Sequence, residues 1–541
     1  MMKNLYVVAI GGSGERVMRS LIMLLASGVQ VNAERVVPVF IENDIDSHAL
    51  KSCLRLLKYY NNAQQGGRDN IGLGVNTIYN KLGEDPREWP SFCRTVISEP
   101  IMLNQAGDTI GTLADVIGRY DRNQPIYDRV DEERNLLFTD DDLNMRLTVG
   151  FVGNPNIGSV VLNSLSLSDT TFENIKTALS PQDGVMVVGS LFGGTGAAGL
   201  PLLVNSINEL PQQNRPILGT IALLPYFVTN PNDNRDVGLI DTTRYNVQSD
   251  AFDAKTRAAL MYYAEYMTSM DCMYYVGDSK AKDVYPHCVG GDGQDNRAHL
   301  VELMSALSIV DFSKQVANGN TNYKRPVWGI NDGNNTQSLP TNLSGIRNKE
   351  LARALVKFRM MMQLFRDPDF LKTSITEKNP YVENLGFKNE MRKWVVDRNQ
   401  AGSSVTSWGL NNLIFEWEKW MNELGDDDAK RKFRIYDDNK PATDKDLTTK
   451  FYCETGFGIA KTEWKGTGFL GMGEKKEFAI APDIQEALAS VYRRLYPKGS
   501  QNDALKFKDE ERLPRLLQII SKALDDVIDN KCIDILKIGG N

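Results

Sequence analysis

Four short stretches of the sequence combine glycine with small polar or acidic residues. They read IGGSGERV (10–17), FIENDIDSHAL (40–50), GFVGNPNIGSVV (150–161) and GSLFGGTGAAG (189–199). Glycine lets backbone amides approach a phosphate, and a helix that follows presents free N–H groups to it. Carboxylates such as those of the second stretch hold Mg²⁺ or its waters beside phosphates. The set predicts a phosphate and magnesium site. The alternative is four tight turns that need glycine only for steric reasons.

Particular groups in these stretches are candidates for the contacts. Arg16 adds a counter-charge, and the Thr195 hydroxyl with successive N–H groups forms a nest for a β- or γ-phosphate. Asp44 and Asp46 are the candidate magnesium ligands, directly or through water, although caps on the next helix would use the same residue types. The other phosphate candidates are Gly11, Gly12, Ser13, Gly14, Glu15, Asn154, Pro155, Gly193, Gly194, Gly196 and Ala197.

These stretches need strands to position them. Apolar runs predict strands at Leu5–Ile10, Val36–Ile41, Leu147–Val152, Val185–Ser190, Ile217–Leu224 and Cys272–Val276, with helical segments between most of them. Strands that are apolar on both faces and separated by helices indicate a mostly parallel sheet covered on two sides. Right-handed crossovers then give a doubly wound α/β domain, which binds ligands at the carboxyl ends of its strands.

The rest of the chain departs from this alternation. Residues 51–145 contain no convincing buried strand and are interpreted as a helical insertion. The Gly- and Asn-rich stretch 331–345 is the best candidate for a domain boundary. Beyond it, 411–425 predicts an amphipathic helix, and 451–464 with 469–482 predicts a hairpin, so the C-terminal part is expected to be α+β.

Composition limits the function further. A chain of 541 residues is expected to form two or three domains, and a net charge of −7 argues against a nucleic-acid surface. No apolar run approaches the roughly eighteen residues of a membrane helix, and no signal peptide is evident, so a cytoplasmic protein is expected. The six cysteines include no C-x-x-C pair and there are only three histidines, which disfavours zinc, redox and Ser-His-Asp chemistry.

In chain order, the loops resemble those of the tubulin/FtsZ superfamily of GTP-binding proteins. FGGTGAA resembles the family signature G-G-G-T-G-x-G, and GNPNIG is similar to A-N-P-E-I-G of FtsZ. The stretch IGGSGER resembles G-Q-C-G-N-Q of tubulin, DIDSHAL is similar to N-T-D-A-Q-A-L, and DTTRYN resembles V-V-E-P-Y-N. DNRAHLVELMSAL is similar to the start of the family's central helix. The resemblance covers about residues 1–315.

This resemblance implies a fold and a function. It implies a GTP-binding domain over 1–330, with the insertion at about 51–145 and a central helix from about 295, followed by a C-terminal α+β domain over 331–541. It adds Tyr245, Asn246 and Asn296 as nucleotide contacts. GTP or GDP with Mg²⁺ is the expected cofactor set, and a bacterial GTPase that self-assembles into filaments is the expected function. A protein partner would bind the insertion or the C-terminal domain.

Hydrolysis in this superfamily is typically completed across a filament contact by a loop N-x-D-x-x-D, which orients the attacking water. The nearest match is SIVDFSKQ (308–315), where Asp311 is the candidate catalytic residue; the alternative is an ordinary carboxylate on a helix surface. Two other functions stay open. One is a nucleotide-binding regulatory or assembly subunit without this catalysis in trans. The other is an NAD-binding Rossmann enzyme with Glu42 on the ribose.

Overall fold

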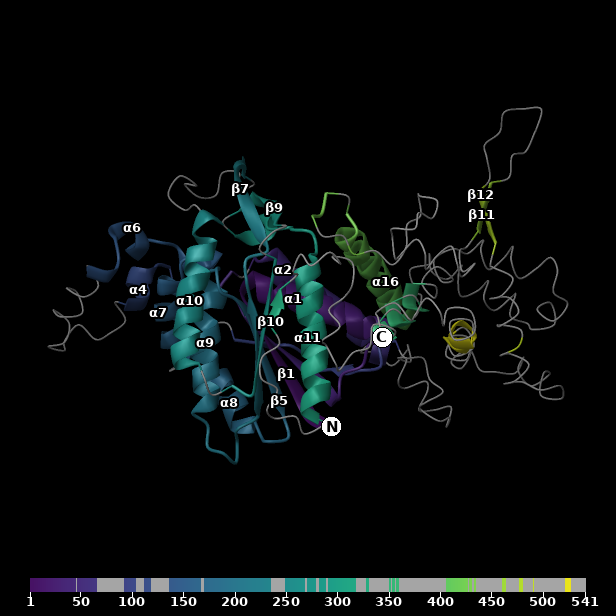
Figure 1. Ribbon diagram of the computed structural model, residues 1–541, viewed down its shortest axis with the longest axis horizontal. Coiled ribbons are helices and arrows are strands. Elements are labelled where there is room, and N and C mark those ends of the chain that lie inside the picture. Colours follow the sequence, from purple (N-terminus) through teal and green to yellow (C-terminus); the bar gives the residue numbers. More distant parts are fainter. Residues whose placement is uncertain are drawn as a thin grey trace.

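The structure is a computed structural model of the whole chain, shown in Figure 1. It describes residues 1–44, 46–65, 92–103, 111–117, 136–166, 170–234, 249–267, 270–278, 282–288, 290–317, 327–329, 350–359 except 352 and 356, 405–430 except 427, 433, 460–463, 476–479, 490 and 521–526.

A parallel sheet organises the described part of the chain. Its strand order is β10-β8-β6-β5-β1-β2-β3, and β4 also pairs with β2. The chain builds one half of the sheet outward from β1, then returns to place β5 against the other side of β1. The switch point, where open α/β sheets bind ligands, therefore lies between β1 and β5. The strands are β1 (Met2–Ile10), β2 (Ala33–Ile41), β3 (Val96–Ile97), β4 (Ile101–Met102), β5 (Gly184–Ser190), β6 (Ile217–Leu223), β8 (Cys272–Gly277) and β10 (Val327–Gly329).

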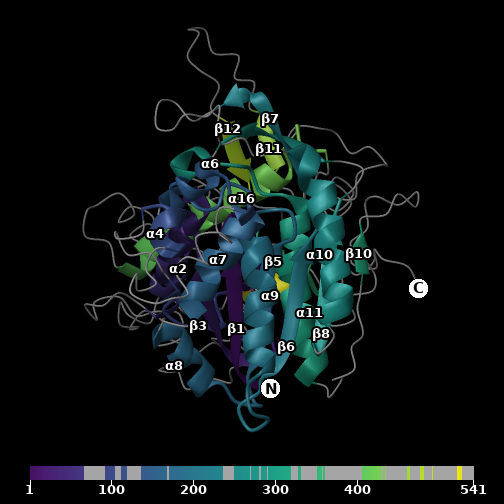
Figure 2. The same ribbon diagram turned by 90° about the vertical axis from the view of Figure 1, so that its left-hand side faces the viewer.

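Helices cover both faces of the sheet, as the sequence predicts (Figures 1 and 2). One layer contains α1 (Gly11–Ser27), α2 (His48–Gln65), α11 (Leu300–Ala317) and α16 (Val405–Leu424). The other contains α7 (Pro155–Ser166), α8 (Thr170–Ala178), α9 (Thr195–Asn208) and α10 (Phe252–Tyr266).

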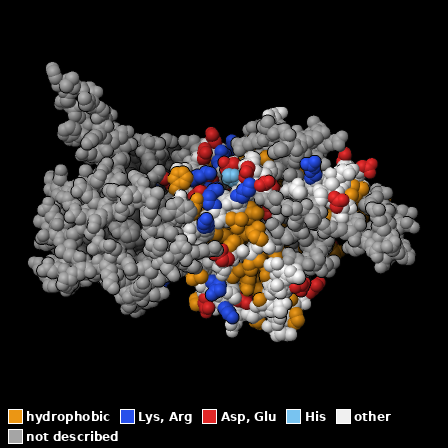
Figure 3. Space-filling view, turned by 180° about the vertical axis from the view of Figure 1, so that it is seen from behind, with side chains coloured by type: hydrophobic (Ala, Val, Ile, Leu, Met, Phe, Trp, Pro, Cys, Tyr) orange, Lys and Arg blue, Asp and Glu red, His pale blue; other side chains and the backbone are white. Residues whose placement is uncertain are grey.

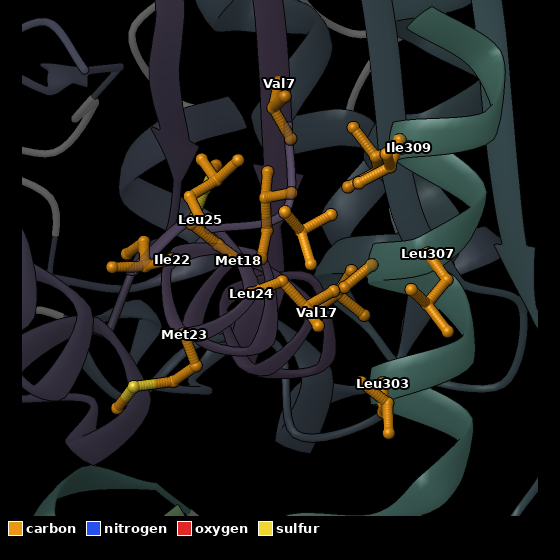
Figure 4. Close-up of a cluster of buried hydrophobic side chains, with 14 of the residues drawn as sticks. Val7, Val17, Met18, Ile22, Met23, Leu24, Leu25, Leu303, Leu307 and Ile309 are labelled. Atoms are coloured by element: carbon orange, nitrogen blue, oxygen red, sulfur yellow. The ribbon is translucent and has the colours of Figure 1, made fainter. Parts of the chain in front are cut away.

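The two-residue period of β1 explains this division. Leu5, Val7 and Ala9 point into the layer of α1 and α11, while Val8 and Ile10 point into the layer of α9. Figure 4 shows Val7 facing the apolar side chains of α1 and α11.

Three segments differ from the sequence-based expectation. The predicted strand Leu147–Val152 is instead a 3-10 turn, η2 (Leu147–Val149), followed by a loop. The segment interpreted as a purely helical insertion contributes β3 and β4 to the sheet edge, besides the short helices α4 (Leu113–Ile117) and α6 (Asp140–Leu143). The stretch 229–238 has the Asn- and Asp-rich composition of a loop, yet its first residues belong to strand β7 (Phe227–Asn234), which pairs with β9 (Asp283–His287) in a separate two-stranded sheet.

Beyond the predicted boundary, whose residues 331–345 lie outside the described part, α16 shares the core of the sheet domain. Trp417 and Trp420 are fully buried, and their indole N–H groups donate to Ser27 at 2.7 Å and Ser20 at 3.3 Å, both on α1. The predicted hairpin is confirmed, because β11 (Ala460–Glu463) pairs antiparallel with β12 (Lys476–Ala479). Among the described residues, no helix is long and apolar enough to cross a membrane.

Candidate functional site

The four glycine-rich stretches meet at the carboxyl edge of the sheet. A methyl group at Gly11 would lie 3.1 Å from the Thr195 Cβ atom, and one at Gly194 would lie 3.2 Å from the Asn154 backbone nitrogen. A methyl group at Gly150 would lie 3.8 Å from Glu42 Oε1. Loops from separate parts of the chain are therefore direct neighbours, as the phosphate hypothesis requires.

Three helices begin at this edge: α1 at Gly11, α7 at Pro155 and α9 at Thr195. None has an acidic residue in its first turn, and no side chain caps α1 or α9. The first N–H groups of a helix have no partner within the helix, and its N-terminus carries a partial positive charge. Gly12, Ser13, Gly193 and Ala197 remain partly exposed here. The edge can therefore bind an anion.

Steric need accounts for some of the glycines but not for all. A methyl group at Gly14 would lie 2.8 Å from the Val188 carbonyl oxygen, and one at Gly196 would lie 2.6 Å from the Ser190 nitrogen. At Gly12, by contrast, the nearest atom would be Gln294 Oε1 at 3.9 Å. A side chain would therefore fit at Gly12 in ordinary van der Waals contact, so steric need alone does not explain this glycine.

Buried carboxylates lie beside the loops. Glu15 is fully buried; its Oε2 accepts a hydrogen bond from Ser47 at 2.9 Å, while its Oε1 has no partner among the residues that the structure describes. Burial raises the pKa of Glu15, and the neighbouring charges of Glu42 and Asp44 raise it further. Burial also raises the pKa of Glu42, to about 7. This is an environment that a cation would stabilise.

The predicted magnesium ligands point in different directions. Asp44 accepts hydrogen bonds from the backbone N–H groups of Gly291 at 2.6 Å and Asp46 at 3.0 Å. The Asp46 side chain is exposed and pairs with Lys51 at 2.9 Å. No group of three or more candidate ligands gathers in metal-binding geometry among the described residues. The unpartnered Glu15 oxygen therefore fits a cation better than Asp46 does.

The loop before α11 folds over this edge. Asp292 accepts a hydrogen bond from Lys51 at 3.1 Å, and Asp295 lies 3.2 Å from His48 on α2. The predicted contact Asn296 belongs to this loop, is partly buried, and donates its backbone N–H to Gln294. Figure 3 shows a histidine side chain among acidic and basic side chains on one face of the molecule. His48 is partly exposed, whereas His287 and His299 are buried.

Arg16 does not point at the phosphate loops, contrary to the prediction. It is buried and forms an ion pair with Glu302 of α11 at 2.5 Å, and it donates to the Arg297 carbonyl oxygen at 3.0 Å. Its guanidinium also lies 5.2 Å from the centre of the Tyr285 ring. Burial lowers the pKa of Arg16, but the Glu302 carboxylate together with Tyr226 and Tyr285 raises it above its ordinary value. Arg16 therefore holds α1 against α11 rather than supplying a free counter-charge.

Asp311 requires a second correction. It is fully buried on the sheet-facing side of α11, where its Oδ2 accepts a hydrogen bond from the Tyr274 hydroxyl at 2.8 Å. Its neighbour Phe312 packs beside Gly184 and Gly219, which lie near the amino ends of β5 and β6. This position does not support the predicted role of Asp311, because a carboxylate inside the core cannot reach a neighbouring subunit. Tyr245 and Asn246 lie outside the described residues.

No pattern in the sequence points to Lys255. This residue of α10 lines a cleft of about 970 Å³ between α7, α9 and α10, which also includes the predicted site residues Asn154, Pro155 and Ala197. Its ammonium group donates to the Gly153 carbonyl oxygen at 2.6 Å. Only the contact with this loop identifies Lys255, because a single lysine on a mixed helix is not distinctive.

The loop contacted by Lys255 has an unusual backbone. Gly150 and Gly153 have φ of 80° and 71°, and Val152 between them has φ of 45°. A β-branched residue is strained in the left-handed region. Strain of this kind persists only where the surroundings hold it in place, and it occurs often at ligand-binding sites.

Comparison with known proteins adds no family to this description. No protein-family model matches the chain, and no curated protein is significantly similar to it.

Proposed function

We propose that this chain is a tubulin/FtsZ-like protein that binds GTP with Mg²⁺ in the cytoplasm and self-assembles. The observation that carries the proposal is the meeting of three helix N-termini, free of acidic residues, at the switch point of the sheet. The partial positive charge of these helix starts, and the first N–H groups of α1 and α9, which no described side chain caps, suit a polyphosphate. The Glu15 oxygen that has no partner among the described residues supports a cation accompanying the phosphate chain.

Dinucleotide-binding enzymes share this strand order, so only the loops can distinguish a polyphosphate site from a dinucleotide site. The first loop has Val17 where the third glycine of the G-x-G-x-x-G motif belongs. Glu42, the residue that would bind a ribose, is buried and its Oε1 accepts the N–H groups of Asn43 and Asp44 at 2.8 and 3.0 Å. A second glycine-rich helix start, at Thr195 beside Gly11, supports a polyphosphate over a dinucleotide.

The burial of Asp311 favours a second candidate function, that of a nucleotide-binding assembly subunit without catalysis in trans. A nucleotide-binding assembly subunit needs no catalytic carboxylate in trans, and the one that the sequence offered lies in the core. Phosphate release that rises steeply with protein concentration would favour hydrolysis across a subunit contact. A low, concentration-independent rate would favour the assembly subunit.

The nucleotide that co-purifies with the chain tests the binding proposal. We expect GDP or GTP to be released on denaturation, and Gly12→Asp to abolish its retention. The backbone at Gly12 accommodates a Cβ atom, so the variant should fold while its carboxylate occupies the space of the phosphates. Gln212→Glu is the matched control, because it adds the same charge at an exposed position before β6, beyond the opposite edge. A chain that releases only NAD, or a Gly12→Asp variant that retains guanine nucleotide, would refute the proposal.

Self-assembly needs its own measurement. We expect light scattering of the full chain to rise on addition of GTP and Mg²⁺ and to stay flat for Gly12→Asp. Scattering that is unchanged by nucleotide over the accessible concentration range would contradict the filament part of the proposal and leave nucleotide binding standing.

A further inference from the structure

The cleft between α7, α9 and α10 carries a cation that no carboxylate of the described residues pairs with. Lys255 is half buried, and within the described part of the chain its only hydrogen bond is to the Gly153 carbonyl oxygen. Burial lowers the pKa of Lys255, which is the effect expected for an ammonium group that lacks a charged partner. A buried ammonium group favours a site where an anion compensates its lost hydration.

The same end of the cleft receives two helix N-termini. Pro155 begins α7 and Ala197 lies in the first turn of α9, and both line the cleft with Lys255. Neither first turn contains an acidic residue. The partial charges of both helix starts therefore add to the charge of the lysine.

Two carboxylates also line the cleft but bind other groups. Asp142 Oδ2 accepts from the Thr139 N–H and hydroxyl at 3.0 and 2.7 Å, and its Oδ1 accepts from the Asn154 side chain at 3.4 Å. Asp141 is exposed to solvent. Neither forms an ion pair with Lys255 within the described part, so no carboxylate of the cleft holds the ammonium group.

A second observation indicates that the cleft receives a ligand. Tyr263 lies two turns beyond Lys255 on the cleft side of α10, about 12 Å along the helix axis. Tyr263 is 3% exposed, and its hydroxyl has no hydrogen-bond partner in the part of the chain that the structure describes. A buried hydroxyl without a partner is costly, and a ligand that offers an acceptor would remove this cost.

We propose that this cleft is a phosphoryl-binding site in which Lys255 contacts the anion. Two sources offer that chemistry. One is the terminal phosphate of the nucleotide, in which case the inference rests on the proposed function. The other is a separate phosphorylated small molecule that extends toward Tyr263, and a cleft of about 970 Å³ has room for one.

Calorimetric titration of the full chain with GTP, GDP and pyrophosphate tests the proposal. Lys255→Met removes the charge and keeps the apolar stem, and Lys255→Arg keeps the charge. Lys282→Met is the matched control, because Lys282 is a nearby lysine already paired with Asp253 at 3.0 Å.

If the terminal phosphate is the ligand, Lys255→Met should weaken the binding of GTP about tenfold or more, as expected for one charge-assisted hydrogen bond, and leave the binding of GDP unchanged. If the ligand is separate, Lys255→Met should weaken only pyrophosphate. Lys255→Arg should retain binding in both cases.

Other outcomes separate this proposal from the proposed function. A wild-type chain that binds pyrophosphate but no guanine nucleotide, with pyrophosphate binding lost in Lys255→Met, would refute the proposed function and support the cleft. Equal affinities of the wild type and Lys255→Met for all three ligands would overturn the cleft proposal. Equal losses in Lys255→Met and Lys282→Met would overturn it as well, because they would show a general effect of charge.

Discussion

The Asp183 carboxylate, at the amino edge of the sheet, accepts four hydrogen bonds: two from Asn4 and two from Ser180, at 2.7–3.1 Å. At the carboxyl edge, the equally buried Glu15 accepts one from Ser47, and its other oxygen has no partner among the described residues. Asp183 is therefore satisfied within the protein, whereas the free oxygen of Glu15 is an acceptor that the proposed ligand and its cation would use.

The largest expected effect is a loss of stability on breaking the buried ion pair between Arg16 and Glu302. Arg16→Met should lower the free energy of unfolding by about 3–5 kcal/mol, because it leaves the Glu302 carboxylate buried without its cation. The double variant Arg16→Met/Glu302→Gln should recover part of this loss. Denaturant unfolding measures both. A loss of nucleotide affinity without a loss of stability would instead make Arg16 the phosphate ligand that the sequence predicted.

At the amino edge we expect a smaller effect on stability and none on binding. Asp183→Ala should cost about 2–3 kcal/mol, because it leaves buried donors of Asn4 and Ser180 without an acceptor. The folded fraction should bind nucleotide as the wild type does. Asp250→Ala, at an exposed carboxylate, is the control and should change neither quantity. A change in nucleotide affinity for Asp183→Ala would contradict the inference that only the carboxyl edge takes part in ligand binding.

The smallest expected effect, counted per pH unit, is a pH dependence of the stability of the ligand-free chain. The pKa of Glu42 is raised from 4.5 to about 7 in the folded state, so between these values the folded chain holds a proton that the unfolded chain has lost. The stabilising contribution is therefore complete below about pH 4.5 and is lost as pH rises through 7, at up to about 1.4 kcal/mol per pH unit for one proton. Glu42→Gln should flatten this slope in thermal unfolding measured across pH. An identical slope in the variant would show that other groups titrate.

The sequence predicts the central strands well, because β1, β2, β5, β6 and β8 are apolar on both faces. It predicts Leu147–Val152 wrongly, since a short apolar run fits a strand or a buried turn, and the left-handed backbone at Gly150 and Val152 turns the chain instead. It misses β3 and β4, because strands of two residues exist only through pairing with β2.

For the candidate site, too, the sequence predicts some features and not others. Glycines at the ends of buried strands predict that the loops meet, and Gly11 does lie beside Thr195. The partners of charged side chains are not predictable in this manner. Arg16 finds Glu302 far along the chain, and Asp311 lies on a helix so apolar on all sides that periodicity does not reveal its buried face.

The packing of α16 on α1 has a consequence for how the chain is made. Trp417 and Trp420 complete the interior beside residues that the ribosome adds about 400 positions earlier. During synthesis, α1 therefore keeps an apolar face uncovered until α16 has left the exit tunnel. Exposed surface of this kind promotes aggregation of incomplete chains. The nascent protein should thus depend on chaperones that shield its first helix, and a chain terminated after α11 should be insoluble.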